Sequence, residues 1–376
     1  MGVSDKIYVG VPPLAPIRLE CGKEISNIPV GVRHYGKLST ERDNAILICH
    51  AFSGDQYVGE QNPTTHRGPW WPMFVGSGKK RKDVVVDTDK YFVICSNVLG
   101  GCSGTFGPST IDDETGKPIG ANFPVITIAD MVKVQKAVVE YFGISRLHSV
   151  IGGSMGGMQV LEWLRQYPDM VGSAMAIATS YHNSAQNVAF NAVAREAIMG
   201  DPNWCGGYYL DKGKFPAKGL ALARKMAHIT YMSPLSLAEK FGRNSISGDE
   251  VSFSLNCDFE IEKYLNHQGQ SFTERFDPNS YIYISRAIDY FDLLRSGGGY
   301  LHRAFSRINS KPIFVASFST DWLFPPYESG ILASGLREAG ADVTEAVYTS
   351  TKGHDAFLLD EPHFLAASRA FLKQVE

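Results

Sequence analysis

The sequence lacks several features that would place it in a specialised class of protein. It has no run of about eighteen apolar residues, so we expect no membrane-spanning helix. Residues 1–20 contain no continuous apolar segment typical of a secretory signal, and we therefore expect a cytoplasmic protein. The six cysteines are scattered without a C-x-x-C pair, a pattern that favours buried thiols over disulfide bonds or zinc ligands.

An excess of charge of one sign is also missing. The chain has 36 Lys and Arg against 39 Asp and Glu, a formal net charge of −3. Its densest basic run is Lys79-Lys80-Arg81-Lys82, followed directly by Asp83, which we interpret as a solvated loop. Without a basic stripe, we expect no nucleic-acid partner. Histidines and cysteines do not cluster at ligand spacing, so we expect no metal and no bound prosthetic group.

The first half of the chain alternates apolar runs of strand length with helical patterns. A chain of 376 residues can bury a large core in one enlarged domain or two. We expect strands at residues 28–35, 44–50, 91–97, 147–151 and 170–178, and helices at 126–142 and 158–167. This rhythm predicts an α/β fold with a mostly parallel sheet and helices on both of its faces.

The pattern changes between about residues 181 and 301, where strand-like runs become scarce. Helical patterns cover residues 185–199, 220–232, 235–241 and 281–294. The α/β rhythm then returns with strands at 312–318 and 343–348 and helices at 328–339 and 362–375. We therefore predict a core made of residues 1–180 and 302–376, with residues 181–301 as a helical lid over the carboxyl ends of the strands.

The stretch Gly152-Gly153-Ser154-Met155-Gly156-Gly157 lies between an expected strand and an expected helix. A bare G-x-S-x-G occurs often by chance, but the strand–turn–helix context favours a nucleophile elbow. A serine on so tight a turn adopts a strained backbone, and its neighbours must be small. The Met155 N–H then lies where an oxyanion forms, and the loop at 50–54 is where such folds place a second N–H.

A serine hydroxyl is a weak nucleophile and needs a base oriented by a carboxylate. In this type of fold the order along the chain is serine, acid, histidine, each after a strand. Asp321 follows the expected strand at 312–318, and His354 follows the one at 343–348. Competing carboxylates are Asp355 and Asp360, and competing late histidines are two residues that do not follow such a strand, His302 and His363. We predict the trio Ser154, Asp321 and His354.

With these motifs in view, the chain resembles homoserine O-acetyltransferases of the α/β-hydrolase superfamily over nearly its whole length. The stretches that carry the resemblance occur in the same order as in that family: residues 95–102 (CSNVLGGC), 152–159 (GGSMGGMQ), 184–187 (SAQN), 219–224 (GLALAR) with 228–231 (HITY), 321–326 (DWLFPP) and 353–357 (GHDAF).

The resemblance implies an α/β-hydrolase fold and a ping-pong reaction with acetyl-CoA and L-homoserine. Ser154 takes the acetyl group, and the backbone N–H groups of Met155 and Phe52 hold the oxyanion. Arg224 matches the family's arginine for the substrate carboxylate, a role that its planar fork suits. Asp355 matches the family's aspartate for the substrate ammonium group. Members of the family are commonly homodimers through their lid helices, and we expect the same here.

The acyl group is predicted from Leu323. Similar enzymes that use succinyl-CoA tend to carry arginine at this position, whereas a leucine would leave a succinyl carboxylate unpaired. This favours acetyl, although relatives commonly have leucine and threonine where this chain has Phe52 and Ser53, which reshapes the acyl pocket. The alternatives are a homoserine O-succinyltransferase, an O-acetyltransferase for another hydroxyl such as that of serine, a serine esterase, or a non-catalytic binding protein.

Overall fold

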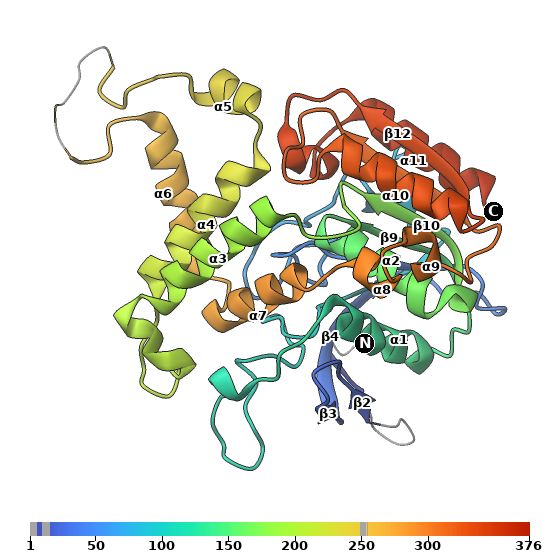
Figure 1. Cartoon of the computed structure of the whole chain (residues 1–376), viewed down its shortest axis with the longest axis horizontal. Helices are drawn as coiled ribbons and strands as arrows, with labels where there is room; N and C mark the ends of the chain where they lie inside the picture. Colours follow the sequence, from blue (N-terminus) through green and yellow to red (C-terminus); the bar gives the residue numbers. More distant parts are fainter. Residues whose placement is uncertain (1–5, 10–15, 249–252, 254) are drawn as a thin grey trace.

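An eight-stranded sheet forms the centre of the molecule (Figure 1). The computed structural model describes residues 6–9, 16–248, 253 and 255–376. The strand order is β1-β4-β8-β5-β9-β10-β11-β12, and every pair from β8 to β12 is parallel, whereas β4 pairs antiparallel with β8 and with β1. The prediction of a mostly parallel sheet is therefore confirmed.

The bounds of these strands are β1 (Lys6–Val9), β4 (Ile28–Tyr35), β5 (Ala45–Cys49), β8 (Phe92–Ser96), β9 (Leu147–Gly153), β10 (Val171–Ile177), β11 (Pro312–Phe318) and β12 (Asp342–Tyr348). Two small two-stranded sheets pair β2 (Ile17–Arg18) with β3 (Glu24–Ile25) and β6 (Val75–Gly76) with β7 (Val86–Asp87). The antiparallel edge formed by β1 was not predicted from the sequence.

Residues along the central strands alternate between two buried faces. In β11, Ile313 and Val315 belong to one hydrophobic core, and Phe314, Ala316 and Phe318 belong to the other. The first face is covered by α1 (Ile128–Tyr141), α2 (Met155–Gln166) and α10 (Pro326–Glu338), and the second by α11 (Pro362–Gln374). Burial on both faces explains why these strands are continuous apolar runs. The short 3₁₀ turns of this core are η1 (Gly120–Asn122), η2 (Pro168–Met170) and η4 (Gly353–Leu358).

Helices fill the segment between β10 and β11, and Figure 1 shows α3 to α6 projecting to one side of the sheet. Their bounds are α3 (Ala185–Met199), η3 (Pro202–Gly207), α4 (Ala217–Tyr231), α5 (Pro234–Phe241), α6 (Glu260–Thr273), α7 (Pro278–Asp289), α8 (Leu293–Ser296) and α9 (Leu301–Ala304). We call this segment the lid. The division of the chain at residues 181 and 301 stays a prediction.

Two details of the lid differ from the sequence-based expectation. The single helix predicted over residues 281–294 is wrong, because Asp292 caps a new helix by accepting the Arg295 N–H at 3.0 Å, and the Phe291 carbonyl accepts the Asn183 N–H. Helix α6 was missed altogether. It is a polar helix, and its Gly269 packs so closely on α4 that an added methyl group would lie 3.0 Å from the Ala221 carbonyl oxygen.

A buried ion pair joins α3 to α7 inside the lid. Arg195 Nη2 lies 2.7 Å from Asp289 Oδ2, and both side chains are 4 % exposed. The amides of Asn183 and Asn191 also donate to Asp289, at 2.9 and 2.8 Å. Loss of Arg195 would leave the buried Asp289 carboxylate with only the longer, half-exposed contact to Arg286 at 3.8 Å, so the Arg195 contact matters for the stability of the lid.

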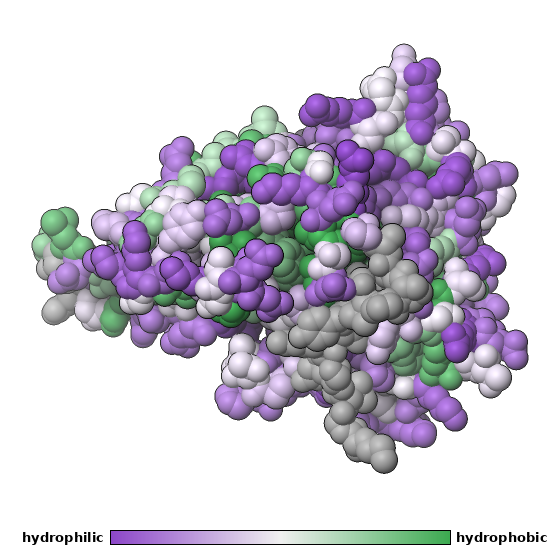
Figure 2. Space-filling model, turned by 90° about the horizontal axis from the view of Figure 1, so that it is seen from below, coloured by the Kyte–Doolittle hydropathy of each residue, from purple (hydrophilic) through white to green (hydrophobic). Residues whose placement is uncertain are grey.

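The surface seen from below is predominantly hydrophilic, with hydrophobic side chains exposed in small groups (Figure 2). Within the described ranges, no helix is both long enough and apolar enough to cross a membrane.

Candidate active site

Ser154 lies on a strained turn between β9 and α2. Its φ of 60° and ψ of −127° are unfavourable for a residue with a side chain and cost about 1–3 kcal/mol. The surroundings hold this conformation: the Ser154 N–H donates to the Ile177 carbonyl at 3.0 Å, and the Thr179 hydroxyl donates to the Ser154 carbonyl at 2.9 Å. The turn places the serine side chain at the carboxyl end of the parallel strands.

The four glycines around Ser154 are required by close approaches of other chain segments. A methyl group added to Gly156 would lie 2.1 Å from the Cys49 carbonyl oxygen, and one on Gly153 would lie 2.4 Å from the Phe357 ring. Gly152 and Gly157 are similarly enclosed. The prediction that the neighbours of the serine must be small is therefore confirmed.

The structure brings together the three residues predicted to act as a trio. His354 Nε2 lies 2.9 Å from Ser154 Oγ, and His354 Nδ1 lies 2.7 Å from Asp321 Oδ2. The other carboxylate oxygen, Oδ1, accepts the backbone N–H groups of Leu323 at 3.0 Å and Phe324 at 2.9 Å. Asp321 is thus fixed at both oxygens, and His354 is held with one nitrogen facing the serine.

The competing candidates do not take these places. His302 lies 3.3 Å from Glu338, and His363 and Asp360 are exposed. Asp355 is next to His354 in the chain, and its charge helps to raise the pKa of His354.

The electrostatic surroundings favour a protonated His354. Burial lowers the pKa of His354, but the charge of Asp321, its hydrogen bond and the charge of Asp355 outweigh this effect, and the pKa is raised above its usual value. The imidazolium that forms when His354 takes the Ser154 proton is therefore stabilised. Burial also raises the pKa of Asp355.

The two predicted oxyanion residues, Phe52 and Met155, line a cavity together with Ser154. Met155 is the first residue of α2, where a backbone N–H has no acceptor within its own helix. Phe52 lies in the loop after β5, which buried His50 holds in place. His50 Nδ1 lies 2.7 Å from the Ala51 carbonyl, and His50 Nε2 accepts the Val98 N–H at 3.0 Å. Burial lowers the pKa of His50, consistent with the neutral ring that these contacts need.

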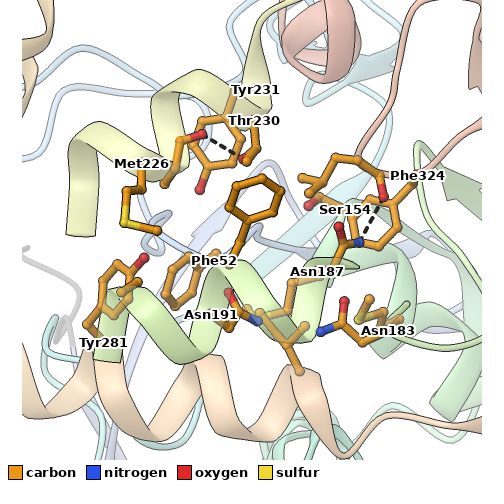
Figure 3. Close-up of a pocket in the computed structure, with 17 residues that line it drawn as sticks. Phe52, Ser154, Asn183, Asn187, Asn191, Met226, Thr230, Tyr231, Tyr281 and Phe324 are labelled. Atoms are coloured by element: carbon orange, nitrogen blue, oxygen red, sulfur yellow. Dashed lines mark hydrogen bonds between the residues drawn. The ribbon is translucent and has the colours of Figure 1, made fainter. Parts of the chain in front are cut away.

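A small cavity of about 60 Å³, which we call the inner cavity, includes Ser154 in its lining (Figure 3). Leu323 lines it, and the Asn187 amide donates to the Leu323 carbonyl at 2.8 Å. The remaining lining residues are mostly apolar or neutral polar, among them Met155, Met158 and Phe324. None of the described residues around the inner cavity carries a positive charge.

A larger cavity of about 510 Å³, the outer cavity, shares Ser154 with the inner cavity and is lined by both predicted substrate residues, Arg224 and Asp355. The Arg224 guanidinium lies over the Phe272 ring at 4.7 Å and the Tyr231 ring at 5.6 Å from their centres. Its Nη1 lies 3.4 Å from Ser53 Oγ. The structure therefore brings one cation and one carboxylate to the same cavity as the serine.

The outer cavity also contains three residues that sequence reasoning missed: Arg67, His228 and Arg275. Arg67 belongs to a long loop and Arg275 to the turn between α6 and α7, and a single arginine in a loop gives no periodic signal. His228 lies on α4 one turn after Arg224, within residues 228–231, one of the stretches that carry the family resemblance. Arg275 Nη1 donates to the Ser53 carbonyl at 3.1 Å.

No group of three or more His, Cys, Asp or Glu side chains positioned for a metal ion occurs in the part of the chain that the structure describes. Its six cysteines are free thiols.

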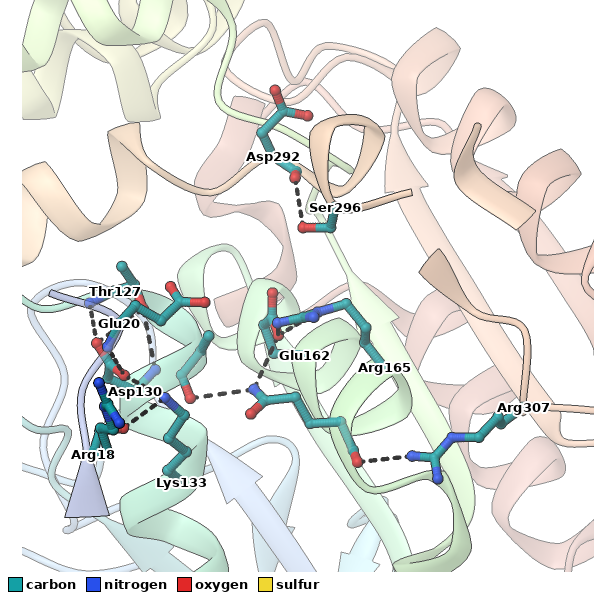
Figure 4. Close-up of polar contacts among 12 residues, drawn as sticks. Arg18, Glu20, Thr127, Asp130, Lys133, Glu162, Arg165, Asp292, Ser296 and Arg307 are labelled. Atoms are coloured by element: carbon teal, nitrogen blue, oxygen red, sulfur yellow. Dashed lines mark hydrogen bonds and ion pairs between the residues drawn. The ribbon is translucent and has the colours of Figure 1, made fainter. Parts of the chain in front are cut away.

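Helix α2, which begins directly after Ser154, is anchored at its other end by a hydrogen bond to α1 and by polar contacts within its own last turns (Figure 4). The Gln166 amide donates to the Ala129 carbonyl at 3.2 Å and to Glu162 at 3.0 Å, and Arg165 pairs with Glu162 at 2.8 Å. Helix α1 itself starts with a capping box in which Thr127 and Asp130 exchange hydrogen bonds. The serine is therefore presented by a rigid element, as catalytic geometry requires.

Comparison with known proteins gives a consistent set of relatives. A model of the α/β-hydrolase fold family matches residues 44–360. Homoserine O-acetyltransferases of Rhodospirillum rubrum and Mesorhizobium japonicum are 51 % and 48 % identical over 358 and 357 residues, which cover 95 % of this chain and 90 % of each of those proteins.

Solved structures of two kinds match the shape of the chain. A homoserine O-acetyltransferase from Bacillus anthracis has a TM-score of 0.84 and 29 % identity, and covers 98 % of this chain and 96 % of its own. Esterase E22 also has a TM-score of 0.84, with 28 % identity, and covers 98 % of this chain and 99 % of its own.

Proposed function

This chain belongs to the homoserine O-acetyltransferase family within the α/β-hydrolase fold, and from that premise we propose that it transfers an acetyl group from acetyl-CoA to the hydroxyl of L-homoserine. The proposal includes a ping-pong mechanism with an acetyl-Ser154 intermediate, and no metal or bound cofactor takes part. The observation that carries it is the hydrogen-bonded series Ser154–His354–Asp321 at the junction of two cavities, one of which contains Arg224 and Asp355.

In the first half-reaction, Ser154 Oγ attacks the thioester carbonyl carbon of acetyl-CoA. His354 Nε2, 2.9 Å away, takes the hydroxyl proton, and Asp321 stabilises the resulting imidazolium. The backbone N–H groups of Phe52 and Met155 hold the oxyanion of the tetrahedral intermediate. When the intermediate collapses, the C–S bond breaks, the sulfur takes the proton from His354, and CoA leaves as the free thiol.

In the second half-reaction, homoserine enters the outer cavity with its carboxylate on Arg224 and its ammonium group on Asp355. His354 removes the hydroxyl proton of homoserine, and the hydroxyl oxygen attacks the acetyl carbonyl carbon. Collapse of this intermediate breaks the bond to Ser154 Oγ, which regains its proton from His354, and O-acetylhomoserine leaves. The two charged groups thus orient one small zwitterion against the acyl-serine.

The inner cavity supports acetyl as the acyl group. It measures about 60 Å³, and Leu323 is among its lining residues. A succinyl chain there would bury a carboxylate without a cation among the described lining residues, and burying an unpaired charge is costly. We propose that Leu323 excludes succinyl-CoA in this way.

The mass of the intact protein tests the intermediate. Incubation with acetyl-CoA alone is expected to add one acetyl group, which peptide mapping places on Ser154, and L-homoserine is expected to remove it as O-acetylhomoserine. The Ser154→Ala variant serves as the control and should gain no acetyl group. Acetylation of a different residue would contradict the mechanism. So would the absence of any acetylated protein after incubation with acetyl-CoA.

Hydrolysis is the second candidate function, because esterase E22 matches the fold as well as the B. anthracis transferase does. It requires only that water reach the acetyl-serine in place of homoserine. The same experiment separates the two: an acetyl-enzyme that decays to free acetate at the same rate with and without homoserine is an esterase.

We also propose that two copies of the chain associate through the lid. Apolar side chains on α3, α4 and α5 support this, since Val193, Leu222, Ile229 and Leu235 are 43–54 % exposed. Light scattering on the purified protein should give twice the mass of the chain, and Leu222→Glu should lower it toward the monomer. An unchanged dimer in that variant would place the contact elsewhere.

A further inference from the structure

A third cavity adjoins the outer cavity, and Asp355 is not among its lining residues. It measures about 530 Å³ and shares Arg67, Arg224, Gln268 and Arg275 with the outer cavity. Its other lining residues are mostly hydrogen-bonding groups: Thr64, Thr65, His267, Ser271 and Glu274, besides the ring of Phe272. We call it the arginine pocket, because guanidinium groups of three separate chain segments meet in it.

Three carboxylates share the cavities with these arginines: Glu274 lines the arginine pocket, and Asp55 and Asp355 line the outer cavity. Within the described residues, however, no carboxylate lies within ion-pair distance (4.0 Å) of Arg67, Arg224 or Arg275. Asp55 accepts hydrogen bonds from the Tyr57 N–H and the Asn62 amide instead.

The crowding of like charges is strong enough to affect the arginines themselves. Burial, together with Arg67 and Arg224, lowers the pKa of Arg275 to about 9, and burial with Arg224 lowers that of Arg67. A pKa of about 9 still leaves Arg275 protonated near neutral pH. Like charges held together in a cavity are costly unless an anion neutralises them, so this arrangement indicates a bound anion.

An independent observation at the same place also indicates a ligand. His228 is 7 % exposed and lines the outer cavity beside Arg224, yet neither of its ring nitrogens has a hydrogen-bond partner. Burial and the nearby arginines lower the pKa of His228 to about 3, so the ring is neutral and offers one donor and one acceptor. A buried polar group without a partner is unfavourable, and a ligand in the cavity would supply the partner.

We propose that Arg67 and Arg275, with the hydroxyl groups of the arginine pocket, bind the phosphate groups of the acyl-CoA donor. This inference rests on the proposed function, because it takes the donor to be a CoA thioester. A guanidinium group can donate two parallel hydrogen bonds to the oxygens of one phosphate, and threonine and serine hydroxyls can donate further ones. The donor must also reach Ser154 through the outer cavity, since the inner cavity is too small for more than a short chain.

The acceptor accounts for only part of this positive charge. Homoserine has one carboxylate, which the Arg224 fork can bind alone, and its ammonium group favours Asp355 over an arginine. Two further guanidinium groups, those of Arg67 and Arg275, line the arginine pocket of about 530 Å³. They exceed what one carboxylate needs. The diphosphate and 3′-phosphate of CoA carry several negative charges and match this excess.

The test compares two thioester donors that differ only beyond the pantetheine arm: acetyl-CoA and S-acetylpantetheine, which has no phosphate. The variants are Arg67→Gln and Arg275→Gln in the full chain. Arg303→Gln is the matched control, since that guanidinium lies over the Tyr300 ring at 4.4 Å on α9 and does not line either cavity. For each enzyme, kcat/KM is measured with both donors at a fixed homoserine concentration.

Loss of one charge-assisted contact to phosphate is expected to lower the preference for acetyl-CoA over S-acetylpantetheine by about ten- to hundredfold in each Gln variant. Adenosine 3′,5′-bisphosphate should inhibit the unmodified protein competitively with acetyl-CoA and the variants much less. The Arg303→Gln protein should keep the original preference.

Equal losses with both donors would overturn the inference. They would assign Arg275 to positioning the Phe52 loop through the Ser53 carbonyl, which it contacts at 3.1 Å. If the Gln variants raised only the KM for homoserine, the inference would also be overturned. The arginines would then bind the carboxylate of the acceptor. Failure of the proposed function looks different: the unmodified protein would then be acylated by p-nitrophenyl acetate and not by acetyl-CoA.

Discussion

Asp321→Asn is the substitution whose effect follows most directly from the geometry. Asp321 Oδ1 accepts the N–H groups of Leu323 and Phe324, and an asparagine would keep its carbonyl oxygen there. Its NH₂ group must then replace Oδ2, which lies 2.7 Å from His354 Nδ1. An NH₂ donor at this place forces His354 to carry its proton on Nε2, where it can no longer accept the Ser154 proton.

The size of the loss can be estimated from the lost charge. A carboxylate and an imidazolium with charge centres about 4 Å apart attract each other by about 4 kcal/mol at an effective dielectric constant of about 20. This corresponds to about 10³ in rate, since each 1.36 kcal/mol is tenfold. The wrong tautomer adds to this loss, so we expect acylation to slow by about 10³- to 10⁴-fold.

The assay is the release of p-nitrophenol from p-nitrophenyl acetate in a stopped-flow instrument, which reports acylation without homoserine. Asp360→Asn is the control, because Asp360 is an exposed carboxylate near His354 in the chain that forms no part of the trio. Thermal melting of both variants checks that the fold is kept. A well-folded Asp321→Asn protein within tenfold of the original rate would refute this reasoning, as would an equal loss in Asp360→Asn.

Three further predictions concern pH, acyl choice and stability. Because the charge of Asp355 helps to raise the pKa of His354, Asp355→Asn should move the acid limb of the pH profile for p-nitrophenyl acetate acylation to lower pH; an unmoved limb would contradict this. Leu323→Arg should raise the preference for succinyl-CoA over acetyl-CoA by about ten- to hundredfold in paired kcat/KM measurements, and no gain would remove Leu323 from acyl selection. Arg195→Leu should destabilise the lid by up to about 3–5 kcal/mol, seen as a lower melting temperature than in Arg303→Leu, because buried Asp289 then keeps only the longer contact to half-exposed Arg286; equal melting temperatures would contradict this.

The trio could be predicted from sequence because each member follows a strand that the sequence itself predicts. Ser154 is marked by flanking glycines, and Asp321 and His354 each come after a strand of the returning α/β pattern. In a parallel sheet the carboxyl ends of neighbouring strands meet at one edge, so order along the chain largely fixes position in space. The substrate residues Arg224 and Asp355 required the family resemblance in addition.

The parts that could not be predicted lack such a local signal. Helix α6 contains Gly269 and many polar residues, and its place is set by close packing on α4, a tertiary contact. The break between α7 and α8 depends on the Asp292 cap and on the contact of Asn183 with Phe291. Arg67 and Arg275 meet only because a long loop and a lid turn converge on one cavity.

The measurement that tests acetyl transfer most directly is the initial rate of CoA release from acetyl-CoA with and without L-homoserine, with the acylated product identified by mass. We predict that release depends on homoserine and yields O-acetylhomoserine, and that succinyl-CoA supports much slower release. CoA release at the same rate without homoserine, with free acetate as the product, would contradict acyl transfer and identify the chain as a hydrolase.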